Sequence, residues 1–473
     1  MNELVEIFLS ERQKLYERFA DRLEKAPNLN RQLVSFQANK EEPIYRWFKY
    51  KEGFSSGLVK YFLKKYSDKP GKLLDPFAGV GTTLFAGQSL GWNSYGIEVL
   101  PVGIFVMQIR EALPKIDPVI LSESLETFWS EFNKIENTTT RFNHISITRD
   151  AFPDDTEVAL NRFLTYCENL RNKDIKTLLR FAAFSLLEEI SYTRKDGQYL
   201  RWDYRSNRDL RGKPFNKGRI LSFEQALKLK LSHIVADLGP QSDSLFDTPR
   251  SNGHDTQPIN IIEGSCLTKL PTLENDSFDF IVTSPPYCNR YDYTRTYALE
   301  LVFLGCDSDK VRNLRQDLLS CTVENKEKLE QLRHLYTSFG KNKYFDSVLR
   351  VYDSSPAMTE VNSVLTELNK LEKLNNNNIP RMVRNYFLEM CFVISEMSRV
   401  TKSGGYCVMV NDNVRYGGEE IPVDLILSEF AEGLGFNARN IFVLPRGKGN
   451  SSQQMGNYGR SEIRKCVYLW QKR

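Results

Sequence analysis

The stretch KLLDPFAGVGTTLFAGQSLGWNSYGIEV, residues 72–99, decides the fold of this chain. A short apolar run comes first, followed by a turn with Gly79 and Gly81, a helical pattern over 81–90 and a second apolar run that ends at Glu98. Two strands joined through a helix predict parallel pairing, because parallel strands need a crossover connection. The glycines let a ligand approach the backbone, and the helix N-terminus offers free N–H groups.

An ordinary strand–turn–helix also explains Gly79 and Gly81 when they are taken alone. Asp75-Pro76-Phe77 before the turn and Glu98 after it favour a ligand site. A carboxylate at the end of the second strand is placed to hold both hydroxyls of a ribose. No lysine follows Gly81, so a phosphate-binding P-loop is disfavoured.

Short apolar runs bounded by turn residues predict the strands of the fold. There are seven, at 72–77, 94–99, 259–264, 278–284, 406–411, 440–445 and 465–472. Helical patterns lie between many of them, at 54–66, 81–90, 382–401 and 421–434. This alternation predicts an α/β fold whose mostly parallel sheet has helices on both faces. The polar, Gly-rich stretch 446–464 between the last two runs predicts an antiparallel hairpin at a sheet edge.

The composition is that of an ordinary globular protein. The 473 residues include 64 Lys+Arg and 60 Asp+Glu, a net charge of +4, and 41% are hydrophobic, which excludes a fibrous or mostly disordered chain. No apolar run approaches the roughly 18 residues that span a bilayer, and the first residues have the pattern of a charged amphipathic helix rather than a signal peptide. We therefore expect a soluble, cytoplasmic protein with no membrane partner. The eight cysteines form no C-x-x-C pair and the four histidines are not at ligand spacing, so no metal site is expected.

A second motif, TSPPY at 283–287, follows the apolar run FDFIV. Its two prolines fix φ and remove N–H donors, which leaves rigid carbonyl acceptors at the strand end. Ser284 adds a hydroxyl group and Tyr287 adds a flat aromatic face. This combination suits an amino group attached to a planar ring. A proline-rich turn that merely ends a strand is the alternative, but its place at the carboxyl edge of an α/β sheet favours a site.

DPFAGVGTT followed by TSPPY resembles the DNA amino-methyltransferases that use S-adenosylmethionine. The Ser-Pro-Pro-Tyr form is similar to that of the cytosine-N4 enzymes, whereas Asp/Asn-Pro-Pro-Tyr is more usual for adenine-N6. The resemblance covers about 50–100, 259–304 and 380–473, roughly half of the chain. It implies a Rossmann-like, seven-stranded methyltransferase sheet with helical insertions and an antiparallel C-terminal hairpin.

The resemblance also implies a division of the chain. An N-terminal helix and the first part of the cofactor-binding core occupy 1–115, a helix-rich insertion for target recognition 116–258, and the catalytic part of the core 259–304. A charged helical insertion (305–377) and the C-terminal part of the core (378–473) complete the chain.

Residue roles follow from the same resemblance. The catalytic residues would be Ser284, Pro285, Pro286 and Tyr287. The cofactor loop would comprise Asp75, Pro76, Phe77, Ala78, Gly79, Gly81, Thr82 and Thr83, with Glu98 on the ribose. Phe54 and Ser55 match a further cofactor-contacting motif, and Glu263 or Ser265 and Cys266 stand where the family has an acid near the adenine amino group.

DNA contacts are expected in the segment 194–219, which has nine Lys/Arg against three Asp, interleaved with aromatic residues. Basic clusters bind phosphate, and arginine reads base edges; a solvated basic face is the alternative. The Gly-rich stretch near the C-terminus is the second candidate. The expected contacts are Arg194, Lys195, Arg201, Trp202, Arg205, Arg208 and Arg211, with Gln453 and Gln454.

We therefore expect a site-specific methyltransferase that acts on the N4 amine of a flipped cytosine in duplex DNA, within a restriction–modification or related defence system. A companion restriction endonuclease is an expected partner. An adenine-N6 enzyme, an RNA base methyltransferase and a non-catalytic DNA-binding subunit stay open as alternatives. A C5-cytosine enzyme would need a cysteine nucleophile, usually directly after a proline, and Cys288 instead follows Tyr287.

Overall fold

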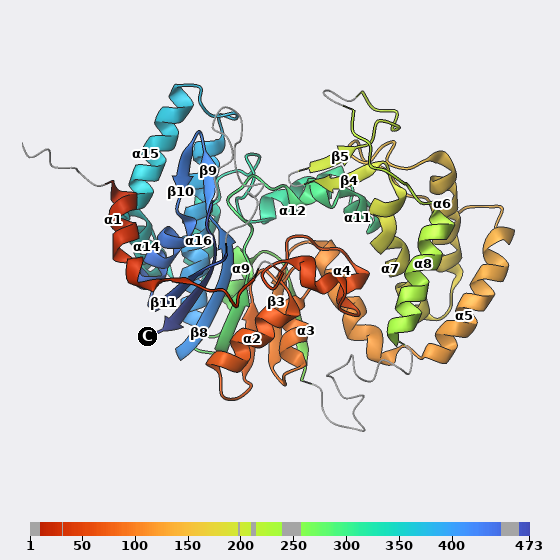
Figure 1. Cartoon of the computed structure of the whole chain (residues 1–473), viewed down its shortest axis with the longest axis horizontal. Coiled ribbons are helices and arrows are strands. Elements are labelled where there is room, and N and C mark those ends of the chain that lie inside the picture. Colours follow the sequence, from red (N-terminus) through yellow and green to blue (C-terminus); the bar gives the residue numbers. More distant parts are fainter. Residues whose placement is uncertain (1–9, 31, 197–198, 210–213, 239–256, 446–462) are drawn as a thin grey trace, which may run out of the picture.

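The structure is a computed structural model that describes residues 10–30, 32–196, 199–209, 214–238, 257–445 and 463–473 (Figure 1). All seven expected strands are present in one sheet, which confirms the α/β fold. They are β2 (Lys72–Asp75), β3 (Asn93–Glu98), β6 (Ile259–Glu263), β7 (Phe278–Thr283), β8 (Thr401–Asp412), β11 (Phe436–Val443) and β12 (Lys465–Lys472).

The sheet has an eighth strand, β1 (Leu23–Lys25), that the sequence pattern did not predict. The strand order is β1-β11-β12-β8-β7-β2-β3-β6, and pairing is parallel except where β12 lies between β8 and β11. The expected hairpin is present, but β1 pairs with β11 and occupies the edge. Three residues are too few to show an alternating pattern, so β1 gives no signal in the sequence.

Side chains alternate between the two faces of the sheet, as the period of a strand requires. On β7, Phe280 and Val282 pack with α2 (Ser56–Tyr66), whereas Ile281 faces the opposite side and packs with α16 (Ile379–Val400). The same face as α2 carries α3 (Thr82–Gln88), and α17 (Val423–Gly433) joins α16 on the other. The sheet is thus buried on both faces, as the continuous apolar runs predicted.

The described residues between 116 and 238 form a helical lobe to the side of the sheet (Figure 1). Its large aromatic core is shared with α4 (Pro101–Ala112) and α11 (Ala298–Phe303), which link it to the sheet. Its own elements are α5 (Pro118–Glu131), α6 (Asp154–Asn169), α7 (Lys173–Ile190), α8 (Phe223–Leu238), β4 (Thr193–Asp196) and β5 (Tyr199–Trp202).

The later part of the segment 305–377 instead packs on the core, whereas Val311 and Leu314 belong to the apolar cluster of the lobe. The helices of this segment are α12 (Ser308–Asp317), α13 (Leu329–Ser338), α14 (Asn342–Asp353) and α15 (Pro356–Lys370). Phe345 of α14 packs on Phe392 of α16, with ring centroids 5.0 Å apart. The N-terminal helix α1 (Glu11–Arg18) lies against α15, where Arg12 pairs with Glu360 at 2.7 Å. Smaller elements elsewhere are α9 (Cys266–Lys269), α10 (Tyr293–Thr296), β9 (Val414–Tyr416) and β10 (Glu419–Ile421). Within the described ranges, no helix has the length and apolar character to span a bilayer.

Candidate active site

A cavity opens at the carboxyl ends of β2, β3 and β7, where a parallel sheet presents its ligand site. About 740 Å³ of space there is free of atoms, including the open mouth of the cavity. Residues from both sequence motifs line it. From the expected cofactor set these are Phe54, Asp75, Pro76, Phe77, Ala78, Gly79, Thr82, Glu98, Ser265 and Cys266, and from the expected catalytic set Ser284 and Pro286.

The turn after β2 lets a ligand approach the backbone closely. Gly79 and Gly81 have φ of 54° and 79°, in the left-handed region that glycine tolerates best. A Cβ added to Gly79 would lie 3.1 Å from the ring of Tyr50, and one added to Gly81 would lie 2.7 Å from Met107 Cγ. Gly81 is also the residue that precedes the first turn of α3. Gly79 therefore presents backbone to the cavity, whereas Gly81 does not line it and instead leaves room for Met107.

Asp75 joins the first motif to the second. Its Oδ1 accepts a hydrogen bond from Thr283 Oγ1 at 2.6 Å and from the Phe77 N–H at 3.0 Å. Thr83, which does not line the cavity, donates to the Val282 carbonyl at 3.2 Å and makes a second link between the motifs. Burial raises the pKa of Asp75 to about 6, and the hydrogen bonds act against that rise. Asp75 therefore positions the two strand ends relative to one another.

Glu98 stands at the end of β3, with its carboxylate turned back over the glycine turn. Its Oε2 accepts from the Gly79 N–H at 2.7 Å, and its Oε1 accepts from Val99 at 2.9 Å and Leu100 at 2.7 Å. Burial raises the pKa of Glu98 to about 7, against these three hydrogen bonds. Three of its roughly four lone-pair sites are thus used, which leaves one on Oε2 to accept from a ribose hydroxyl. The set of donors and acceptors therefore fits an S-adenosylmethionine-type cofactor.

The burial of Glu98 predicts a pH dependence of stability. The folded-state pKa of about 7 exceeds the ordinary 4.5, so the folded protein binds this proton more tightly than the unfolded chain does. The stabilisation is complete below about pH 4.5 and is lost as the pH rises through about 7. Urea unfolding at several pH values should show this decline, and Glu98→Gln should make it shallower. An unchanged pH slope in the variant would contradict the assignment.

Two expected cofactor contacts need correction or refinement. Ser55 does not line the cavity, because its Oγ caps α2 by accepting from the Leu58 N–H at 3.3 Å while donating to the Leu33 carbonyl at 2.7 Å. Phe54, its neighbour, does line the cavity. Glu263 is exposed and does not line the cavity, whereas Ser265 and Cys266 do.

Several lining residues carried no expectation. Tyr50, Glu52 and Tyr293 line the cavity, together with the segment 317–319. Tyr291 and Tyr297 both donate hydroxyl hydrogen bonds to the Glu52 carboxylate, and the ring of Tyr50 stacks on Tyr297 with centroids 5.3 Å apart. The run of tyrosines after TSPPY was the available signal for this cluster. The segment 317–319 has no signal in the sequence.

The second motif places its hydroxyl beside β8. Ser284 Oγ donates to the Val410 carbonyl at 3.1 Å and lies 3.4 Å from Tyr287 Oη. Because its hydrogen is used, the Ser284 oxygen keeps lone pairs for an N–H donor. Tyr287 is partly buried, with Lys465 Nζ 5.8 Å from its ring centroid. Pro285 and Tyr287 are absent from the cavity lining.

Cys288 is fully buried, and burial raises the pKa of its thiol well above the ordinary 9.0. A nucleophilic cysteine needs an accessible thiolate. The environment of Cys288 therefore suits a packed side chain rather than covalent catalysis.

The basic segment forms the β4–β5 hairpin and the loop after it. Arg194 and Arg201 are exposed and face one another across the hairpin. Arg208 lies 3.9 Å above the ring of Trp202, and Arg205 pairs with Asp203 at 2.7 Å. Arg211, Gln453 and Gln454 lie outside the described residues.

The expectation that Lys195 contacts DNA is wrong. Its side chain is 4% exposed, pairs with Glu300 at 2.5 Å and lies 4.4 Å from the ring centroid of Tyr297. It therefore points into the protein, because strand residues alternate between faces. Arg208 also donates to the carbonyls of Ser146 and Arg149, so part of its guanidinium is engaged inside the lobe.

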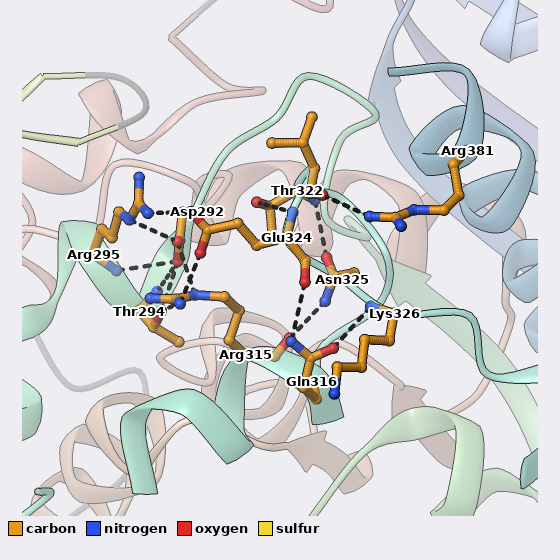
Figure 2. Close-up of polar contacts among 11 residues, drawn as sticks. Asp292, Thr294, Arg295, Arg315, Gln316, Thr322, Glu324, Asn325, Lys326 and Arg381 are labelled. Carbon is orange, nitrogen blue, oxygen red and sulfur yellow. Dashed lines mark hydrogen bonds and ion pairs between the residues drawn. The ribbon is translucent and has the colours of Figure 1, made fainter. Parts of the chain in front are cut away.

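A polar network ties the residues after TSPPY to the second insertion (Figure 2). Arg315 pairs with Asp292 at 2.9 Å and with Glu324 at 2.8 Å, and Arg295 pairs with the same two carboxylates. Asp292 also caps α10 through the N–H groups of Thr294 and Arg295. The network fixes the end of α12, which leads directly into the cavity wall.

Comparisons with known proteins agree with this geometry. A family model described as DNA methylase matches residues 4–102. The type II methyltransferase M.AvaI of Nostoc sp. is 47% identical over 464 residues, covering 97% of this chain and 92% of that protein. M.BsoBI of Geobacillus stearothermophilus is 41% identical, with 98% and 92% covered, and M.MvaI of Kocuria varians is 24% identical, with 86% of each covered. No solved structure matches the chain. The similarity extends over nearly the whole chain, and the chain belongs to the type II DNA methyltransferases of restriction–modification systems.

Proposed function

We propose that this enzyme transfers a methyl group from S-adenosylmethionine to the N4 amine of a cytosine in duplex DNA. The observation that carries the proposal is that Ser284 and Pro286 line the same cavity as the glycine turn and Glu98. A Thr283–Asp75 hydrogen bond of 2.6 Å keeps the two motifs in register. The amine acceptor site and the cofactor site therefore share one space at the sheet edge.

The family implies S-adenosylmethionine as methyl donor, and named residues would hold it. In this proposal the Gly79 turn, Phe54 and Phe77 contact the cofactor, and Glu98 holds its ribose. The cofactor supplies an electrophilic methyl group on a sulfonium. The protein's task is then to position an amine and raise its nucleophilicity.

An exocyclic amine is a weak nucleophile, because its lone pair is delocalised into the ring. In the proposed mechanism the Ser284 oxygen and the Pro285 carbonyl accept the amine hydrogens. The nitrogen can then become tetrahedral and aim its lone pair at the methyl group. The new N–C bond would form as the methyl–sulfur bond breaks, the sulfur would leave as a neutral thioether, and the methylated nitrogen would release one proton to water. Positioning and electrostatic assistance suffice, without a covalent intermediate. A base inside a duplex cannot reach this site, so the cytosine must flip out, and Tyr287 would stack on it.

We propose that the β4–β5 hairpin contacts DNA. Arg194 and Arg201 are exposed cross-strand neighbours, and Arg201 also lies 4.1 Å from the ring centroid of Phe215. Two adjacent positive charges at the surface suit a phosphate group. Trp202, Arg205 and Arg208 belong to the same proposed surface, although Arg205 also pairs with Asp203 and Arg208 also donates to the Ser146 carbonyl.

The salt dependence of binding tests this surface. The double variant Arg194→Ala, Arg201→Ala should have a weaker salt dependence. Log affinity should fall less steeply with log salt, by about 0.9 per lost contact and about 1.8 in all. Arg439→Ala on β11, an exposed arginine of the core sheet, is the control and should leave the slope unchanged. Fluorescence anisotropy with labelled duplex at several salt concentrations measures it. A wild-type slope in the double variant would mean that the hairpin is only a solvated face.

The proposed partners are duplex DNA and a restriction endonuclease that cuts the same site. The proposed location is the cytoplasm, where a bacterial enzyme meets its DNA substrate.

Methyl transfer itself is tested with S-adenosylmethionine that carries a labelled methyl group. Duplex DNA of mixed sequence should take up label, and RNA of the same sequence should not. Label in RNA alone would make the enzyme an RNA base methyltransferase, and label in neither would support a non-catalytic DNA-binding subunit.

A further inference from the structure

The loop that follows the second motif contains a residue with strained backbone. Arg290 lies three residues after Tyr287 and has φ of 65°, in the left-handed region. Long side chains rarely adopt this conformation, and the residues that do so gather at functional sites. Arg290 is therefore a candidate functional residue that neither sequence motif includes.

Contacts on both sides of Arg290 impose the strain. Before it, Cys288 is fully buried, and its carbonyl accepts a hydrogen bond from the Tyr416 hydroxyl at 2.7 Å. After it, the Tyr291 N–H donates to the Asn289 side chain at 3.2 Å, and the Tyr291 hydroxyl donates to a carboxylate of the cavity wall. The chain has to turn sharply between these two anchors. The loop thus fixes Arg290 close to the aromatic ring of the second motif.

The Arg290 guanidinium is not neutralised inside the protein. Its Nη1 donates to the Asn375 side chain at 2.8 Å, whereas its Nε is buried and donates to no acceptor in the described part of the chain. It forms no ion pair with any carboxylate that the structure describes, although Arg295, five residues later, pairs with two. A partly buried charge without a partner lowers stability, as does an unsatisfied N–H. The position of this side chain therefore suits an anion that comes from outside the chain.

We infer that Arg290 binds a DNA phosphate group next to the target nucleotide and so holds the flipped base against Tyr287. The inference rests on the proposed function, because it takes a base in DNA as the occupant of the second motif. Guanidinium N–H groups match phosphate oxygens in geometry and charge, and Asn375 fixes the orientation of the guanidinium. The phosphate supplies the negative charge that the surrounding protein does not.

The distance along the chain allows this contact. Three extended residues span at most about 11 Å, so the Arg290 Cα lies within about that distance of the Tyr287 Cα. One sugar joins a base to its phosphate groups, so a base on the Tyr287 ring brings these groups within reach of a long side chain. Because the contact forms only when the base occupies the site, it favours the flipped nucleotide over the stacked one.

A double-mutant cycle between protein and DNA tests the contact. Sequencing of DNA methylated by the wild-type protein first locates the target. Duplexes with one such site then carry an uncharged methylphosphonate at the phosphate either before or after the target nucleotide. At one of these positions it should weaken wild-type binding, measured by fluorescence anisotropy, by about tenfold to a hundredfold, the value of a hydrogen bond to a charged group.

Arg290→Gly should bind unmodified duplex more weakly by a similar factor, and the methylphosphonate should weaken its binding no further. Arg439→Ala, which removes an exposed arginine from β11, is the matched control and should keep the wild-type sensitivity. Arg290→Gln keeps the length of the side chain without its charge, and it repeats the measurement if the glycine variant does not fold.

Thermal unfolding separates the strain from the DNA contact. Glycine tolerates positive φ, so Arg290→Gly should unfold at the wild-type temperature or above it, although it binds DNA more weakly. Asp276→Gly is the control for strain, because Asp276 has φ of 46° and precedes β7 at its opposite end. This variant should also stay folded, and it should keep the wild-type sensitivity to the methylphosphonate.

The outcomes distinguish this inference from the proposed function. If Arg290→Gly keeps the wild-type sensitivity, or if the wild-type protein is insensitive at both positions, the inference is overturned and the proposed function stands. Loss of affinity for S-adenosylhomocysteine together with DNA affinity would give Arg290 a structural role only and would also overturn the inference. A wild-type protein that methylates no DNA would overturn both together.

Discussion

Replacing Gly79 with leucine is expected to lower the affinity for S-adenosylhomocysteine by about a hundredfold, since overpacking a filled site costs about 1–3 kcal/mol. The Gly79 backbone has φ of 54°, and its Cβ would meet the Tyr50 ring at 3.1 Å. The Gly79 carbonyl is equally close-packed, because a Cβ on Gly103 would come within 2.2 Å of it. A leucine side chain thus has nowhere to go except the cofactor cavity.

The Gly404→Leu variant is the control that distinguishes backbone strain from obstruction of the cofactor cavity. Gly404 also has positive φ, 80°, but a Cβ there meets nothing within 4 Å. Both variants should lose stability to a similar extent in thermal unfolding, and only Gly79→Leu should lose cofactor affinity in calorimetry. Wild-type affinity in a folded Gly79→Leu protein would show that the cofactor does not lie against this turn.

Ser284→Ala should slow methyl transfer by about 10²–10³-fold, as does removal of one placed hydrogen-bonding group from other active sites. The Ser284 hydroxyl hydrogen is committed to the Val410 carbonyl at 3.1 Å, so its oxygen serves as an acceptor for the target amine. Loss of the acceptor leaves the amine lone pair delocalised in the ring. Cofactor affinity should stay near wild type, because in this account the hydroxyl contacts the base.

Ser277→Ala is the matched control for this prediction. Ser277 precedes the same strand at its opposite end, and its hydroxyl donates to the Glu274 carbonyl, so its replacement should not change the rate. Single-turnover measurement of labelled methyl transfer compares the variants. A Ser284→Ala enzyme with the wild-type rate would remove Ser284 from the mechanism, and an equal loss of cofactor affinity would assign it to the cofactor.

The sequence predicted the sheet because its strands are short apolar runs between turn residues. β7 illustrates this, since FDFIVT is buried on both faces and ends directly at TSPPY. β1 escaped prediction because it is three residues long and is held by pairing with β11 rather than by its own pattern. Pairing with a distant strand is a tertiary effect that local sequence does not encode.

The site was predictable where the ligand needs special backbone or a rigid acceptor, as at Gly79 and Ser284. It was not predictable where tertiary packing decides. Lys195 reads as one member of a basic run, but the strand period turns it inward toward Glu300. Ser55 reads as a cofactor contact, but it occupies the first position before α2, where serine is a preferred helix cap. Asp317 lies 51 residues after Cys266 in the sequence, and only folding brings it to the same cavity.

The identity of the methylated nucleoside tests the central proposal most directly. Duplex DNA of mixed sequence would be incubated with the enzyme and S-adenosylmethionine, digested to nucleosides and analysed by mass spectrometry, with the Ser284→Ala protein as background control. The account predicts N4-methyldeoxycytidine that is strongly reduced with the variant. N6-methyldeoxyadenosine as the sole product would contradict the choice of base, and 5-methyldeoxycytidine would contradict the mechanism, since the buried Cys288 offers no nucleophile for that reaction.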